Sequence, residues 1–298
     1  MFIATVSLIV LPLSFGDVDR GEIAGTLEAP GINESSGVAA SRINRGMFWT
    51  HNDSGDGPNL YLIDARGKHR ATWRVKDAGA VDWEDICSFR LGEKVMLAIA
   101  DTGDNDRRRK YVSLYLVEEP SLPPAEQGRQ ALGLKVFRRL DFTYQDGPDD
   151  CEAVGFDPIS QQFVIVTKRP SGALALLAGP AEVYLLPLTS TTQGRPVVLD
   201  PVASIAGIQV TAADVAPDGS GILVLTFLDA LWFHRPSDQA WAEVLAEHRK
   251  RWIRMPPRRQ GEAVCFEPDG RHVFLTSEGA KQPLWRRAAP LFENESED

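Results

Sequence analysis

The sequence has few cysteines and no motif built from them. Cys87, Cys151 and Cys265 are the only three in 298 residues, and no two of them have CxxC spacing. A disulfide framework or a closed zinc site is therefore excluded as the device that organises the fold. We expect the three cysteines to be small buried core residues.

The local signatures of several large enzyme classes are also missing. The chain contains no GxSxG, HExxH, P-loop or dinucleotide-binding glycine pattern, and its five histidines form no cluster in the sequence. Serine hydrolase, zinc protease and nucleotide-cofactor functions therefore have no local support.

Positive charge is in deficit. Lys and Arg number 32 against 41 Asp and Glu, which gives a formal net charge of -9. Nucleic acid and anionic membranes are poor partners for such a chain, because both attract surplus basic residues. Metal cations or cationic ligands suit it better.

A hydrophobic run long enough to span a bilayer is lacking as well. Residues 1–15 are almost entirely apolar, and small residues precede the polar segment that begins at Asp17. This pattern predicts a signal peptide over residues 1–16 and a secreted or periplasmic protein. The segment has no basic start, so a misassigned start codon and a buried strand are the alternatives.

What the sequence does contain is an internal repeat. Residues 152–167 align without a gap on residues 262–277, and a third copy begins at Thr211. Weaker copies begin at Ser36 and Glu84. Each copy has an apolar strand, a turn and a second apolar strand, and two of the turns read Pro-Asp-Gly, as in a β-hairpin.

Further strands follow each hairpin, so the unit has four antiparallel strands. Units of this kind, repeated five times, predict an all-β, five-bladed β-propeller in a single domain over residues 17–292, with an acidic tail at 293–298. The last unit lacks room for a fourth strand. We expect residues 21–28 to supply it and to close the ring, which removes an exposed sheet edge.

The first positions of the five copies carry oxygen-bearing side chains. They are Ser36, Glu84, Glu152, Thr211 and Glu262. Propeller symmetry brings these positions together at one mouth of the central channel, where the three carboxylates would repel one another. A hard divalent cation relieves that repulsion, and calcium accepts such a loose oxygen ring more readily than magnesium. The alternative is that these side chains face solvent or cap backbone amides of a neighbouring strand.

The loops between second and third strands return to the same mouth. We expect Asp53 or Asp101 to orient a water for attack. The predicted substrate-binding residues are Asn52, Asp104, Asn105, Lys168, Arg169 and Glu278. Clusters of Asp, Asn and Gly are equally typical of ordinary turns, and the basic run 107–110 is more typical of a solvated loop.

The five ring positions, in this order and spacing, resemble those of the calcium-activated nucleotidases, or apyrases. Residues 48–55 are similar to that family's first aspartate-bearing loop, and residues 163–169 to its third-blade strand with paired basic residues. The resemblance implies a five-bladed propeller with an axial calcium. Thr211 stands where the family has its second serine, and the loop 101–105 differs. The chain also resembles exported bacterial propellers of unassigned function and, in its acidic mouth, calcium-dependent propeller phytases.

Two functions follow as hypotheses. The first is a calcium-dependent hydrolase of phosphate esters or anhydrides, acting on a small anionic substrate. The second is a non-catalytic propeller that binds a peptide, glycan or protein partner at the same mouth, with a structural metal. A lactonase using the same calcium is a third possibility, because propellers host unrelated activities. We expect a monomer in each case.

Overall fold

The computed structural model of the protein describes residues 21–29, 31–124, 131–168, 180–192, 194–205, 209–246 and 250–290. The fold is all-β, as predicted, with 55% of the chain in strands and 2% in a helix. In this part of the chain no helix has both the length and the apolar character needed to cross a membrane. The expected signal peptide and the acidic tail lie outside the described residues.

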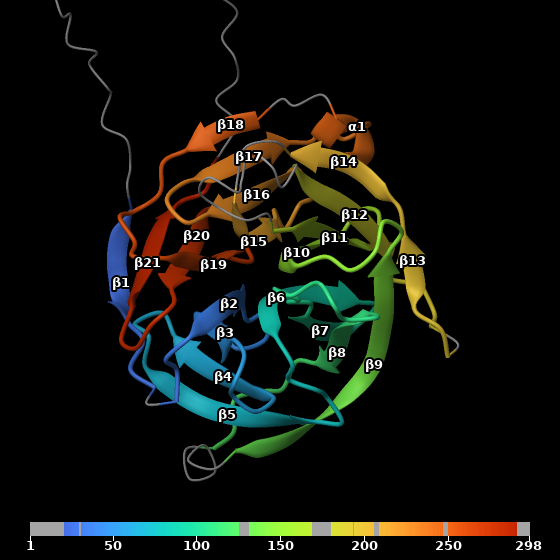
Figure 1. Cartoon of the computed structure of the whole chain (residues 1–298). Coiled ribbons are helices and arrows are strands. Elements are labelled where there is room, and N and C mark those ends of the chain that lie inside the picture. Colours follow the sequence, from blue (N-terminus) through green and yellow to red (C-terminus); the bar gives the residue numbers. More distant parts are fainter. Residues whose placement is uncertain are drawn as a thin grey trace, which may run out of the picture.

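Five strands lie innermost in Figure 1, each at the inner edge of a run of antiparallel strands. They are β2 (Ser35–Ala40), β6 (Trp83–Leu91), β10 (Cys151–Asp157), β15 (Val210–Val215) and β19 (Gly261–Phe266). Neighbours in this series contact one another, and β19 contacts β2, so the series closes on itself. Their side chains are mostly buried on both faces, which explains why the strands read as short, nearly continuous apolar runs.

Three further strands lead outward in each run. The second strands are β3 (Met47–Asn52), β7 (Lys94–Asp101), β11 (Gln162–Thr167), β16 (Gly221–Thr226) and β20 (His272–Ser277). The third strands are β4 (Asn59–Asp64), β8 (Val112–Glu118), β12 (Ala181–Pro187), β17 (Ala230–His234) and β21 (Pro283–Ala288). The outermost strands are β5 (His69–Lys76), β9 (Leu132–Tyr144), β14 (Pro201–Ile205), β18 (Lys250–Ile253) and β1 (Glu22–Thr26).

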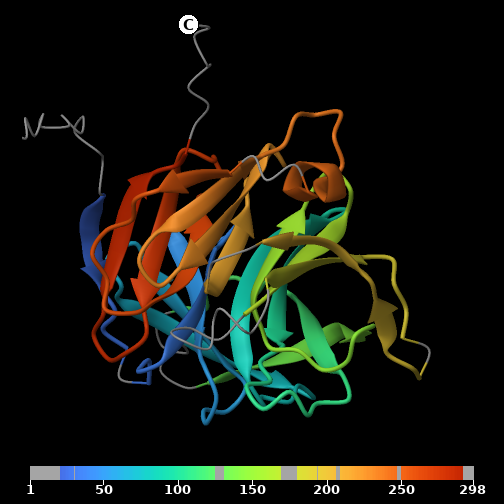
Figure 2. The ribbon, with the colours of Figure 1, turned by 45° about the horizontal axis from the view of Figure 1, so that its top comes forward.

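The N-terminal strand completes the last run. β1 pairs antiparallel with β21, with Ile23 opposite Trp285 and Thr26 opposite Pro283. Figure 2 shows this blue strand beside the red ones. The predicted pairing of residues 21–28 with the last repeat is therefore confirmed, and the outer edge of β21 is covered.

The runs β2–β5 and β6–β9 are joined into one sheet, which the repeat did not predict. β9 is 13 residues long, and its first part pairs parallel with β5. Leu132, Leu134 and Val136 alternate with exposed residues and pack on the core between the two runs. The short strand β13 (Val197–Leu199) pairs parallel with the other end of β9.

Apolar clusters fill the spaces between neighbouring runs. One example joins Val38 and Phe48 of the first run to Phe274 and Leu284 of the last. The three cysteines are free and buried within these layers, as expected. Burial of this apolar area supplies the main driving force for the fold.

A short helix, α1 (Trp241–Ala246), follows β17 in the chain and packs mainly against β14 of the neighbouring run. Trp241, Val244 and Leu245 are its buried residues, and their spacing is that of one helix face. The sequence analysis did not predict this helix.

Candidate functional site

The five ring positions share one local geometry. Each is the second residue of an innermost strand, and each lies at a β-bulge, where the register against the second strand slips by one residue. A bulge leaves one residue without a cross-strand partner and re-aims its side chain. The bulged residues are Ser36, Glu84, Glu152, Thr211 and Glu262.

All five ring side chains are buried, with at most 5% of their surface exposed. The Ser36 hydroxyl donates to Oε2 of Glu84 at 3.4 Å. The Thr211 hydroxyl donates to the carbonyl oxygen of Gly261 at 2.6 Å. The predicted ring is therefore a buried polar centre rather than a set of solvent-facing side chains.

Two aspartates that the sequence analysis missed complete this centre. Oxygen atoms of Asp53, Asp82 and Glu84 lie within 4.8 Å of one another, and so do those of Glu84, Asp150 and Glu152. Glu84 belongs to both groups, so the carboxylates form one continuous cluster. Such oxygen groups could hold a metal ion.

The sequence carried a signal for these aspartates. Asp82 and Asp150 lie two residues before ring glutamates, and so does Gln260. The corresponding residues before Ser36 and Thr211 are Glu34 and Gln209. In the repeat alignment that predicted the ring, the position two residues before each ring residue is thus always an acidic or an amide side chain.

A glycine leaves room for the carboxylates of Glu84 and Asp82. A Cβ atom at Gly103 would overlap oxygen atoms of both side chains. The amide of Gly103 also donates to the carbonyl oxygen of Asp82 at 3.2 Å. The loop after β7 therefore approaches the acidic centre as bare backbone.

One ammonium group partly balances the centre. Nζ of Lys168 lies 2.5 Å from Oε1 of Glu152, and the Lys168 side chain is 20% exposed. On the other side, Nε2 of Gln260 donates to Glu262 at 2.7 Å and also to Glu278. Lys168 and Glu278 are thus brought to the ring, as predicted, while Arg169 lies outside the described residues.

The carboxyl groups hold their protons more tightly than free side chains do. Burial raises the pKa of Asp82 to about 7, together with its hydrogen bond to Asp53. Burial likewise raises the pKa of Glu262 to about 7 and that of Glu152 to about 8, although Lys168 opposes the shift at Glu152. The pKa of Glu84 lies well above its usual range because of burial and the charge of Glu152. Crowded, desolvated carboxylates of this kind favour either protons or a cation.

Several predicted loop residues are engaged in holding the loops. Asp101 is buried, pairs with Nη2 of Arg109 at 2.9 Å and accepts the amide of Asp82 at 3.1 Å. Asp104 accepts the amides of Arg108 and Arg109 at 2.9 and 2.8 Å.

The remaining predicted loop residues differ in their surroundings. The Asn52 side chain accepts the amides of Asn33 and Glu34 at 3.1 Å each and donates to Gly31. Asn105 is exposed. Of the predicted catalytic pair, Asp53 joins the acidic centre, whereas Asp101 is held in the ion pair with Arg109.

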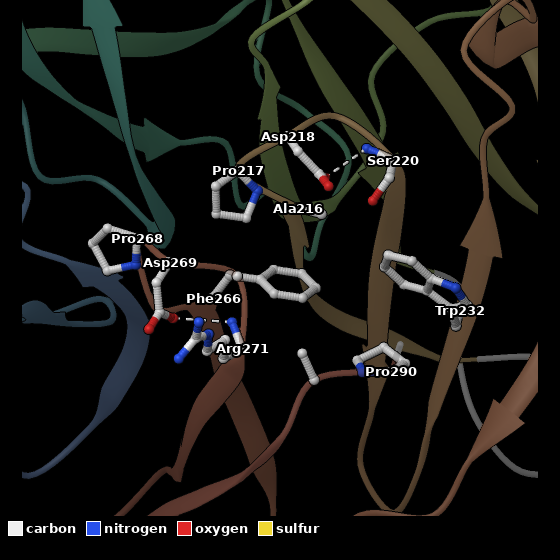
Figure 3. Close-up of a pocket in the computed structure, with 12 residues that line it drawn as sticks. Ala216, Pro217, Asp218, Ser220, Trp232, Phe266, Pro268, Asp269, Arg271 and Pro290 are labelled. Carbon is white, nitrogen blue, oxygen red and sulfur yellow. Dashed lines mark hydrogen bonds between the residues drawn. The ribbon is translucent and has the colours of Figure 1, made fainter. Parts of the chain in front are cut away.

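A separate pocket of about 410 Å³ lies at the other end of the same strands, beyond β15 and β19. Figure 3 shows Phe266 and Trp232 among its apolar walls. Asp218 and Asp269 accept amides within their own turns, from Ser220 and Arg271, at 2.9 Å each. These two aspartates therefore stabilise turns, whereas Asp269 also forms, with Glu267 and His272, a further group whose ligand atoms lie within 4.8 Å of one another.

Known families do not identify the chain. No protein-family model matches the sequence, and no curated protein matches it. What the protein does therefore has to follow from the geometry of the ring.

Proposed function

We propose that the protein is a five-bladed β-propeller that binds a divalent cation, calcium, at the mouth of its central channel. Counting the joined runs β2–β5 and β6–β9 as two blades gives five four-stranded units, each filled against the next by an apolar layer. The closed series of innermost strands and the covering of β21 by β1 support this architecture.

The observation that carries the proposal is the set of bulges at one register. Five bulges place buried, oxygen-bearing side chains at one register, and two of them, Glu84 and Glu152, form one cluster with Asp53, Asp82 and Asp150. Lys168 opposes their negative charge, and among the described residues the charges of Arg107 and Arg109 act on Asp150 and Asp82 in the same direction. Calcium takes six to eight oxygen ligands in flexible geometry, whereas magnesium demands a small, near-octahedral set. A wide cluster of carboxylates and hydroxyls therefore suits calcium better.

Calcium titration of the metal-stripped protein tests this proposal. We expect wild type to bind calcium in an isothermal titration and to bind magnesium more weakly. Glu152→Gln should lower the calcium affinity by about tenfold or more, because the charge of the ligand set tunes affinity. Glu118→Gln is the matched control, since Glu118 is 55% exposed and pairs with Lys94 on the surface. Absence of calcium binding to wild type would contradict the proposal.

We assign to this site the hydrolysis of phosphate esters or anhydrides, in line with the resemblance to calcium-activated nucleotidases. A bound cation would polarise a phosphoryl oxygen there. Lys168 is partly exposed beside the ring and can contact an anionic group. Asp53 is partly buried at the edge of the acidic cluster and can accept a proton from an attacking water.

A phosphate-release screen tests the activity. Nucleoside di- and triphosphates, phytate and simple aryl phosphates would be assayed with calcium and with EDTA. We expect calcium-dependent release from at least one class and its loss in Glu152→Gln. Release that is unchanged in Glu152→Gln would exclude the ring as the catalytic centre.

One observation favours the second candidate, a non-catalytic binding propeller. The side chains of Asn52, Asp101 and Asp104 are engaged in hydrogen bonds or an ion pair within the protein, so they are not free to bind a substrate. In that case calcium should raise the melting temperature while no phosphorylated compound is turned over. The same two assays separate the candidates.

A further inference from the structure

Arg258 is a buried cation beside the ring that the proposed site does not use. It lies in the segment between β18 and β19, and only 9% of its surface is exposed. Its neighbour Arg259, in contrast, is exposed.

The hydrogen bonds of Arg258 satisfy only one of its three nitrogens. Nη2 donates to the carbonyl oxygens of Thr226 and Leu228, each at 3.3 Å. Nε and Nη1 are buried and have no hydrogen-bond partner within the described part of the chain. Among the described residues no carboxylate pairs with this guanidinium, and burial lowers its pKa to about 10, although the charge of Asp229 acts in the opposite direction.

A glycine provides the seat for this side chain. A Cβ atom at Gly261 would overlap Nε of Arg258 and would lie 2.7 Å from Nη2. Gly261 directly precedes the ring residue Glu262, and its carbonyl oxygen accepts the hydroxyl of Thr211. The guanidinium therefore lies over the start of β19, next to two ring positions.

Another buried arginine of this protein shows what a structural guanidinium looks like. Arg235 is 5% exposed and makes a two-pronged pair with Asp157, at 2.7 and 3.0 Å. Arg258 has no such acid. The charge of Asp229 acts on Arg258 without pairing with it, and a buried charge without a paired acid costs free energy, so a purely structural role would be met better by an apolar or a paired side chain.

We propose that Arg258 is an anion-binding residue, which receives an oxyanion, a phosphate or a carboxylate, of the ligand bound at the ring. The planar guanidinium has two free donors, Nε and Nη1, and each of them shares an edge with Nη2, so a two-pronged bond to the two oxygens of such a group uses one free donor and Nη2. Among the described residues its only hydrogen bonds are the two 3.3 Å ones from Nη2, so releasing Nη2 to a ligand gives up little. The inference deepens the proposed function by naming the residue that receives the anionic group of the ligand, and it depends on that function only for the position of the site.

Ligand-induced stabilisation tests the inference. The melting temperature would be measured with increasing inorganic phosphate and, in a second arm, acetate, for wild type, Arg258→Met, Arg258→Lys and Arg259→Met. We expect wild type and Arg259→Met to be stabilised equally. Arg258→Met should bind the anion about tenfold more weakly or worse, the usual loss for a charged hydrogen bond. Arg258→Lys should fall between them, because it keeps the charge but not the fork. The anion that raises the melting temperature more shows whether the ligand group is a phosphate or a carboxylate.

The stability of the variant without ligand is the second readout. Arg258→Met should melt at the wild-type temperature or above it, because an unpaired buried charge has been removed. A marked drop in melting temperature with an unchanged response to phosphate would overturn the proposal in favour of a structural role.

The calcium titration separates this inference from the proposed function. Arg258→Met should bind calcium as wild type does. If wild type binds calcium but neither anion stabilises it, the anion site fails alone. If phosphate binds through Arg258 in EDTA but calcium does not bind, the cation site fails alone.

Discussion

Without divalent cations, the protein is expected to lose stability as the pH rises from about 5 to about 8, and calcium is expected to remove much of that loss. The carboxyl groups of the ring and of the neighbouring Asp82 are the cause. The pKa values of Asp82 and Glu262 are about 7 and that of Glu152 is about 8, all raised above the usual range chiefly by burial. Urea unfolding at several pH values, in EDTA and in calcium, measures the effect.

Stability falls with rising pH because the folded protein binds more protons than the unfolded chain in this range. With a raised pKa, the folded protein still holds protons at a pH where the unfolded chain has released them. The stabilisation is complete below the unfolded pKa and is lost as the pH rises through the folded pKa. Calcium binds the deprotonated carboxylates, so its apparent affinity should rise with pH and its binding should release protons.

Two buried carboxyl groups outside the ring also contribute to the pH dependence of stability, and calcium distinguishes their contribution from that of the ring. Burial raises the pKa of Asp214 to about 7 and that of Asp85 well above its usual range. Both accept backbone amides of innermost strands, so calcium should not cancel their share of the slope. Glu84→Gln should flatten the calcium-sensitive part, whereas Glu118→Gln should not. Stability that rises between pH 5 and 8 in EDTA would contradict the interpretation.

The members of the ring could be predicted from the sequence because the repeat alignment places them at equivalent positions. Once residues 152–167 and 262–277 are aligned, each strand start is fixed to one register, and a closed ring places equal registers together. The bulges are not visible in the sequence, since a bulge depends on the pairing of two strands. They nevertheless fall on the same five residues, all of which are buried.

The loop residues could not be assigned from the sequence in the same way. An aspartate or asparagine that stabilises a turn cannot be distinguished in the sequence from one that binds a ligand. The role of Asp104 depends on Arg108 and Arg109, and its own amide donates to the distant Asp150. Arg258 is a similar case, because its lack of an acidic partner becomes visible only when the packing is known.

The largest single loss of stability is expected at Asp157, at the end of β10. Its side chain is fully buried and accepts from Nη1 of Arg235 at 2.7 Å, from Nη2 at 3.0 Å and from Nε1 of Trp241 at 3.0 Å. This group ties the third run of strands to the end of β17 and to α1. Asp157→Ala leaves the Arg235 charge buried and unpaired, which should cost about 3–5 kcal/mol in urea unfolding.

A double-mutant cycle shows whether the pair or the buried charge dominates. Arg235→Met in the Asp157→Ala background should recover part of the loss, because removing both partners leaves no uncompensated charge. Asp218→Ala is the control, since this turn aspartate accepts a single exposed amide and should cost about 1 kcal/mol or less. Equal losses at positions 157 and 218 would contradict the assignment.

The pH dependence of this group runs opposite to that of the ring. Burial alone would raise the pKa of Asp157, but the hydrogen bonds from Arg235, Ser160 and Ile159 outweigh it and leave the pKa below the usual range. A lowered pKa gives stability that is present above the unfolded value and is lost as the pH falls through the folded one. Acid should therefore destabilise wild type below about pH 4 and have a smaller effect on Asp157→Ala, measured at equal distance from each midpoint. The two slopes act at opposite ends of the pH range, so one set of unfolding curves measures the buried ion pair and the acidic ring independently.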